Sequence, residues 1–180
     1  MKNIILSILC IAFAQYTYSS DFITRWDMSK PGLHPTTLIF GVGTTGTVSY
    51  TWETIPAGTN GSGTFTGNTA YITGLPAGAM IRLSIDTTNF NRININNGVD
   101  RIRLMDVEQW GTVAWASMQN AFYGCENLNI TATDVPDLSL VTNLSNMFAS
   151  CFVLNGPINI NTWNTSNITD MSSMFTRTIN

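Results

Sequence analysis

Apolar and polar residues alternate along much of the first half of the chain. Residues 47–52 place valine, tyrosine and tryptophan on one side and threonine or serine on the other, and residues 80–86 also alternate. This period of two is that of a half-buried β-strand. Glycine, asparagine and proline separate the alternating segments, and residues 56–63 are predicted to form a loop. The pattern predicts a small β-sandwich with strands at residues 36–40, 47–52, 69–73, 80–86, 91–96 and 101–105.

A longer repeat replaces this alternation from Trp110 onward. Apolar residues of one segment recur at a nearly constant step in a second and a third segment, as the phenylalanines at positions 122, 148 and 175 show. A constant step of this length is typical of stacked repeats, in which each turn of chain buries its apolar face against the next. Leu144, Met147 and Phe148 stand at positions i, i+3 and i+4, which predicts a short helix in the repeat. In the third repeat, a strand and turn at residues 163–167 are predicted to come before this helix. The predicted repeat core consists of Trp115, Met118, Phe122, Leu128, Val141, Leu144, Met147, Phe148, Leu154, Trp163, Ile168, Met171, Met174 and Phe175.

Residues 163–175 carry the most specific motif of the chain, Trp-Asn-Thr-Ser-Asn-Ile-Thr-Asp-Met-Ser-Ser-Met-Phe. This string resembles the repeat of the BspA-like leucine-rich-repeat surface proteins, whose repeat region was formerly a domain of unknown function. The resemblance implies a mixed β and α+β fold: a β-sandwich-like domain at 21–107, then a short leucine-rich-repeat-like solenoid of about three repeats at 108–180. It also implies secretion, surface display and adhesion.

Residues 1–20 have the layout of a secretory signal peptide. Lys2 precedes an apolar run at residues 4–14, and small polar residues follow it. Cleavage is expected near Ser19 or Ser20, with a site near Ala14 as the alternative; a buried N-terminal helix is the competing interpretation of the whole segment. The run is shorter than the roughly 20 residues of a membrane span, so no transmembrane segment is expected after cleavage. Cys10 lies within the run and is assigned to the removed peptide.

The third repeat is expected to leave an apolar face uncovered. The third repeat motif ends at Phe175, close to Asn180. A stack that stops without a polar cap exposes its apolar face, here expected at Met174 and Phe175. We therefore expect a truncated or short variant of a longer surface protein, or a partner chain that covers the open end.

Charge and chemistry narrow the function classes. Only 11% of the residues are charged and the net charge is −3, whereas nucleic-acid binding requires a basic surface. His34 is the single histidine, which is too few for a histidine-based zinc site or a catalytic triad. The carboxylates at residues 100–108 and 134–137 lack the spacing of a calcium loop. We expect no catalytic, cofactor-binding or metal-binding residues, and no enzyme.

Cysteines and aromatic residues each leave two interpretations open. Cys125 and Cys151 occupy equivalent positions of successive repeats, so they form either a disulfide or a column of packed thiols. The tryptophans of the repeat, at positions 110, 115 and 163, belong to the core or, alternatively, stack on sugars; the core is favoured. The segment 41–46, Gly-Val-Gly-Thr-Thr-Gly, lacks the ending of a phosphate-binding loop and is predicted to be a turn.

These features predict a secreted binding protein, free or attached to the cell surface. Its expected role is adhesion to an extracellular protein or glycan that the sequence does not identify. One alternative is a structural component or truncated fragment of a larger surface protein. The other is a secreted hydrolase, for which no residue set stands out.

Overall fold

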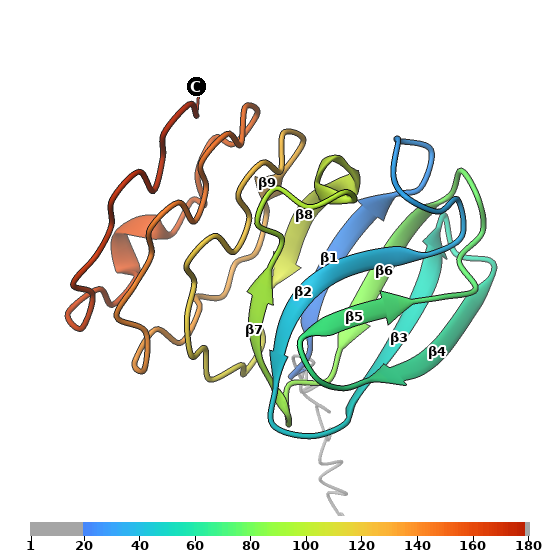
Figure 1. Cartoon of the computed structure of the whole chain (residues 1–180), viewed down its shortest axis with the longest axis horizontal. Coiled ribbons are helices and arrows are strands. Elements are labelled where there is room, and N and C mark those ends of the chain that lie inside the picture. Colours follow the sequence, from blue (N-terminus) through green and yellow to red (C-terminus); the bar gives the residue numbers. More distant parts are fainter. Residues whose placement is uncertain (1–19, 179–180) are drawn as a thin grey trace, which may run out of the picture.

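The computed structural model describes residues 20–178, so the predicted signal peptide and Cys10 lie outside the described residues except for Ser20. Residues 20–178 are almost all β, with 35% strand, 4% helical residues and no α-helix, and they form two sheets (Figure 1). The expected fold class, mixed β and α+β with a leucine-rich-repeat-like solenoid, is therefore wrong. No helix in this part of the chain is long and apolar enough to span a membrane.

The larger sheet has six strands in the order β4-β3-β6-β1-β8-β9. Neighbouring strands of this sheet pair antiparallel, except that β8 and β9 pair parallel. One face of β3 is buried through Val48, Tyr50 and Trp52, as the alternation predicts. The strands are β1 (Phe22–Asp27), β3 (Val48–Ile55), β4 (Asn60–Phe65), β6 (Met80–Ile85), β8 (Leu104–Gln109) and β9 (Asn129–Ile130).

The smaller sheet has three antiparallel strands in the order β5-β2-β7. They are β5 (Thr69–Ile72), β2 (Leu38–Thr44) and β7 (Phe90–Asn94). The two sheets pack face to face, and the rings of Trp26 on β1 and Phe40 on β2 stack across the interface with centroids 5.1 Å apart (Figure 1). The interior between the sheets is apolar, which supplies the main driving force for this half of the fold.

Close approach between neighbours explains strands that the sequence pattern missed. β4 begins inside the predicted loop, and β2 continues through Gly41 and Gly43, where a turn was predicted. A Cβ at Gly61 would lie 2.7 Å from the indole of Trp52, and one at Gly41 would lie 2.5 Å from the carbonyl oxygen of Asn94. These glycines therefore make room for a neighbouring side chain or backbone rather than for a turn. The strand expected at 101–105 is instead the 3-10 helix η1 (Arg101–Arg103) followed by β8.

Three turn segments follow the sheets, named here the first turn (117–124), the second turn (143–150) and the third turn (170–177). Every second backbone N–H of one turn donates to a carbonyl of the next. In the first turn, Phe122 N–H donates to Met147 O at 2.9 Å, and in the second, Phe148 N–H donates to Met174 O at 2.9 Å. The donors of this ladder are Met118, Asn120, Phe122 and Gly124 in the first turn, and Leu144, Asn146, Phe148 and Ser150 in the second.

The helix predicted from Leu144, Met147 and Phe148 does not form, because every second N–H group donates to a carbonyl of the third turn rather than to one within the segment. Met147 N–H donates to Leu144 O at 3.0 Å, a bond of turn type, while its neighbours bond to the third turn. Asn146 and Ser150 have φ of 54° and 59°, a left-handed conformation that a right-handed helix cannot contain. The strand expected at 163–167 is also absent. The 3-10 helix η2 (Ile160–Thr162) lies just before these residues. Without regular strands and helices to stack, the repeat is not a leucine-rich-repeat-like solenoid.

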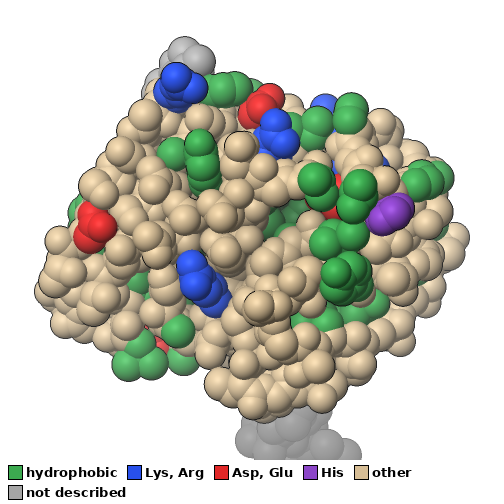
Figure 2. Space-filling view, in the orientation of Figure 1, with side chains coloured by type: hydrophobic (Ala, Val, Ile, Leu, Met, Phe, Trp, Pro, Cys, Tyr) green, Lys and Arg blue, Asp and Glu red, His purple; other side chains and the backbone are tan. Residues whose placement is uncertain are grey.

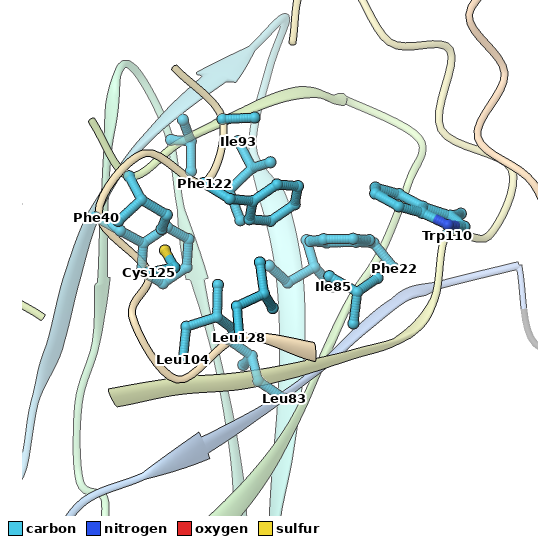
Figure 3. Packing of buried hydrophobic residues seen from close by; sticks show 14 of the residues in the cluster. Phe22, Phe40, Leu83, Ile85, Ile93, Leu104, Trp110, Phe122, Cys125 and Leu128 are labelled. Carbon is cyan, nitrogen blue, oxygen red and sulfur yellow. The ribbon is translucent and has the colours of Figure 1, made fainter. Parts of the chain in front are cut away.

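A single apolar core runs from the sheets into the turns. Figure 3 shows Phe122 and Leu128 of the repeat region beside Phe22 of β1 and Ile85 of β6. Phe22 also packs edge-on against Trp115, with centroids 5.2 Å apart. The turns are therefore stabilised by packing against the sheets as well as by the hydrogen bonds between them.

Candidate functional site

The structure brings most of the predicted repeat-core residues together in the interior. All are buried except Ile168, which is half-buried, and Met171 and Phe175, which are 45% and 43% exposed. Met174, which the sequence pattern places on the open face, is instead buried in the core. Trp110, Trp115 and Trp163 are buried too, which favours the core interpretation over sugar stacking.

Cys125 and Cys151, which directly follow the first and second turns, are free, buried thiols. The Sγ of Cys151 donates to the carbonyl oxygen of Phe122 at 3.2 Å. Burial raises the pKa of Cys125 well above its usual value and raises that of Cys151 to about 12. Both thiols therefore keep their protons at neutral pH and pack as small apolar groups rather than as nucleophiles.

The buried charges of the chain hold loops in place. Arg103 and Asp100 form an ion pair of 3.0 Å, and both side chains are almost fully buried. The Arg103 guanidinium also donates to the carbonyls of Lys30, His34 and Thr37, which ties the exposed loop around His34 to η1. The role of this pair is structural, since its polar atoms are taken up by the chain itself.

The other carboxylates singled out in the sequence behave similarly. Asp106 accepts hydrogen bonds from Arg25 and from the backbone and hydroxyl of Thr131, and burial raises its pKa. Asp134 accepts from the backbone N–H groups of Trp110 and Gly111. Within residues 20–178 no group of three His, Cys, Asp or Glu residues is placed to hold a metal ion.

A polar face covers the outer side of the larger sheet. Arg82 lies at its centre and donates to Glu108 at 2.7 Å and to Glu53 at 3.1 Å. Arg82 also lines an open depression of about 630 Å³, together with Ile23, Thr51, Trp52, Glu53, Asn60, Gly61, Ser62 and Ser84. Arg82, Glu53 and Glu108 thus neutralise one another on this face.

The outer side of the third turn is different, because it is apolar and open. We call it the third-turn surface; it contains the exposed side chains of Ile160, Met171 and Phe175, and the buried Trp163 and Met174 line, together with these, Leu144 and Thr165, a cavity of about 240 Å³. Figure 2 shows mostly uncharged side chains over the C-terminal turns, on the left of the view. The equivalents of Met171 and Phe175 in the first two turns are fully buried. The surface is thus the uncovered counterpart of an interface that the chain makes twice within itself.

The backbone of the third turn also has an open edge. The N–H groups of Met171, Ser173, Phe175 and Arg177 are the counterparts of those that connect the earlier turns, and none has an acceptor among residues 20–178. We call this row of N–H groups the third-turn edge. The edge and the third-turn surface together form the candidate functional site.

The family comparison covers the part of the chain that contains this site. A family model described as "Mycoplasma protein of unknown function, DUF285" matches residues 86–180, more than half of the chain. The match includes β7, and the residues that follow β7 already belong to the ladder, since Ile95 N–H donates to Ala121 O at 2.9 Å. No curated protein and no solved structure matches the chain. On the strength of the family model, the chain belongs to the family of Mycoplasma proteins of unknown function, DUF285.

Proposed function

We propose that this chain is a secreted or cell-surface binding protein that acts in adhesion and has no catalytic activity of its own. The observation that carries the proposal is the third-turn surface, where Met171 and Phe175 are exposed beside an apolar cavity. Contiguous exposed apolar surface is uncommon on soluble proteins and marks sites of interaction. Paired charges and buried thiols elsewhere support binding over chemistry.

Two features of the sequence support export of the chain and its relationship to the BspA-like surface proteins. The signal-peptide layout of residues 1–20 supports export. The repeat string at 163–175 supports a relation between this family and the BspA-like surface proteins, in the pattern of the repeat and not in its fold. An adhesive role follows from that relation as part of the proposal.

A structural role is the second candidate, and the same surface favours it. If the chain is one component of a larger surface assembly, the third-turn surface is covered permanently rather than by a reversible ligand. The two roles differ in kinetics: an adhesin exchanges its ligand, whereas an assembly component co-purifies with its partner.

The test is binding of the purified full chain to an array of extracellular matrix proteins and glycans. Phe175→Ser and Met171→Ser remove apolar area from the third-turn surface, and Leu33→Ser removes an exposed apolar side chain in the distant loop at 30–37. The proposal expects saturable binding to one ligand class, which Phe175→Ser and Met171→Ser weaken and Leu33→Ser leaves unchanged. A folded full chain that binds nothing on the array, and that is isolated without a partner, contradicts both candidate functions.

A further inference from the structure

We infer that the outer edge of β4 pairs antiparallel with the same edge of a second copy of this chain, which produces a symmetric dimer. The larger sheets of the two copies then form one continuous sheet around a two-fold axis at Ser62. The inference goes beyond the proposed function and does not depend on it. β4 is the last strand of the larger sheet and lies at the end of the molecule opposite the C-terminal turns (Figure 1).

The register of β4 against β3 shows which backbone groups of β4 face outward. Thr54 N–H donates to Thr59 O at 2.9 Å, so Thr59 and every second residue after it form hydrogen bonds with β3. The residues between them, Asn60, Ser62 and Thr64, direct their N–H and C=O groups away from β3. No backbone hydrogen bond from another segment within residues 20–178 reaches these groups. Each of these residues therefore offers one donor and one acceptor along a free edge.

This edge lacks the features that keep most sheet edges from pairing. β4 has six residues, none of them charged and none of them proline, and it pairs with β3 without a shift in register. Natural edge strands are usually protected by charges, proline, bulges or short length. The neighbouring edge of the smaller sheet is better protected, because β5 has only four residues and carries Tyr71, which is 55% exposed. β4 is therefore the more open of the two edges at this end of the sandwich.

A second β4 matches the free edge by symmetry. When two copies align antiparallel with Ser62 opposite Ser62, Asn60 of each copy lies opposite Thr64 of the other. Because these residues all face outward, each opposing pair exchanges both of its backbone hydrogen bonds. Their side chains are exposed and uncharged, so no like charges meet across the axis, where they would oppose pairing.

The inner face of β4 favours a second copy over an unrelated strand. A Cβ at Gly61 would lie 2.7 Å from the Trp52 indole, and a Cβ at Gly63 would collide with the Tyr50 hydroxyl. Both rings of β3 therefore extend over the glycines of β4. In the symmetric pair, Gly61 of one copy lies opposite Gly63 of the other, so neither strand places a side chain against these rings. A strand with larger residues at these positions would compete with the rings for the same space.

The size and shape of this interface determine how the dimer behaves. A single pair of short strands buries less surface than a permanent dimer interface, so we expect reversible, concentration-dependent association. The C-terminal turns of the two copies lie at the two far ends of the dimer, since they are opposite β4 in each copy (Figure 1). The symmetry also means that one substitution at Ser62 changes the interface twice at the same point.

The experiment is sedimentation velocity of the purified full chain between micromolar and millimolar concentration. Ser62→Lys and Ser62→Glu each place two like charges opposite one another on the axis, at an exposed position. Tyr71→Lys is the control at the exposed edge of β5. Circular dichroism shows whether each variant is folded.

We expect the wild-type chain to dimerise, and each Ser62 variant to raise the dissociation constant of the dimer by about tenfold or more. Tyr71→Lys should leave it unchanged. An equimolar mixture of the Ser62→Lys and Ser62→Glu chains should associate more tightly than either alone, because lysine then lies opposite glutamate. This rescue also excludes misfolding as the cause of the loss.

Four results overturn the inference. They are a chain that remains monomeric at millimolar concentration, a dimer that neither Ser62 variant weakens, a dimer that Tyr71→Lys weakens equally, and a mixture that associates no better than its components. A monomeric chain whose Ser62 amide is protected from hydrogen exchange only when another protein is added would identify a foreign strand as the occupant, and this too contradicts the dimer.

Discussion

Phe122 and Phe148 stack almost parallel, with ring centroids 5.6 Å apart and planes 5° apart, although they belong to different turns of the chain. Between them, Phe122 N–H donates to Met147 O at 2.9 Å. The same pair of contacts joins Phe148 to the third turn. One residue type at one repeat position thus supports both the packing and the backbone ladder of the C-terminal half.

The first prediction concerns the middle of this column. Phe148→Ala removes a fully buried ring that is packed on both faces, so we expect a loss of about 3–5 kcal/mol in the free energy of unfolding. Phe175→Ala removes a ring that is 43% exposed and packed on one face, and should cost about 1 kcal/mol. Urea unfolding followed by tryptophan fluorescence measures both. Equal losses would show that the Phe175 ring is packed as closely as the Phe148 ring, which contradicts an open third turn.

The buried ion pair gives a second prediction. Arg103→Ala leaves the Asp100 carboxylate buried without its partner and frees the carbonyls of the loop at 30–37, so a loss of about 3–5 kcal/mol is expected. Arg82→Ala removes two ion pairs of a side chain that is 44% exposed, and should cost less than about 1 kcal/mol. The same urea experiment compares them. A loss at Arg103 as small as that at Arg82 contradicts a clamping role.

The structure could be predicted from the sequence where the controlling interaction is local. The alternation in 47–52 and 80–86 correctly predicts β3 and β6, because the period of two depends only on which face of a strand is buried. The helix at Leu144 was predicted wrongly for the converse reason. Its spacing fits a helix, but the N–H groups of Asn146 and Phe148 bond to the third turn, which lies far along the chain and which local spacing does not reveal.

Other differences have the same origin. β4 resembles a loop in sequence because its glycines face the rings of Trp52 and Tyr50 on the neighbouring strand. At the candidate site, the motif at 163–175 indicates an open apolar end, yet it misplaces Met174, which packs inward, and does not single out Met171. The row of N–H donors was not predicted, since it depends on the direction of the ladder.

A third prediction follows from the glycines of β4. Gly61→Ala forces a Cβ against the Trp52 indole, so a loss of about 1–3 kcal/mol is expected. Ser62→Ala is the matched control on the exposed face of the same strand and should change stability by less than about 0.5 kcal/mol. Thermal unfolding by circular dichroism distinguishes the two. A neutral Gly61→Ala would mean that the indole has room to move.

The fourth prediction concerns the thiols. Because burial keeps Cys125 and Cys151 protonated, a thiol-specific alkylating agent at pH 8 should modify neither in the folded chain and both in guanidinium chloride. Mass spectrometry of proteolytic peptides identifies the modified positions. Fast modification of Cys151 in the folded chain contradicts its burial.

The same thiols predict how stability depends on pH. An unfolded thiol loses its proton near pH 8.5, whereas folded Cys151, with its pKa raised by burial, keeps it to about pH 12, so the folded state binds more protons in this window. The free energy of unfolding therefore falls as pH rises above about 8.5, by at most about 1.4 kcal/mol per pH unit for each thiol. In Cys151→Ala the slope should be smaller, as measured by urea unfolding between pH 8 and 10. An unchanged slope would assign the pH dependence to other groups.

The most direct test of an open third-turn edge is amide hydrogen exchange in the free full chain, read by NMR at three equivalent positions. Phe122 and Phe148 N–H donate to carbonyls of the following turn, whereas Phe175 N–H has no acceptor among residues 20–178. We expect slow exchange at Phe122 and Phe148 and fast exchange at Phe175. Equal protection at all three positions would show that the third-turn edge is already paired, and would contradict its assignment as the binding site.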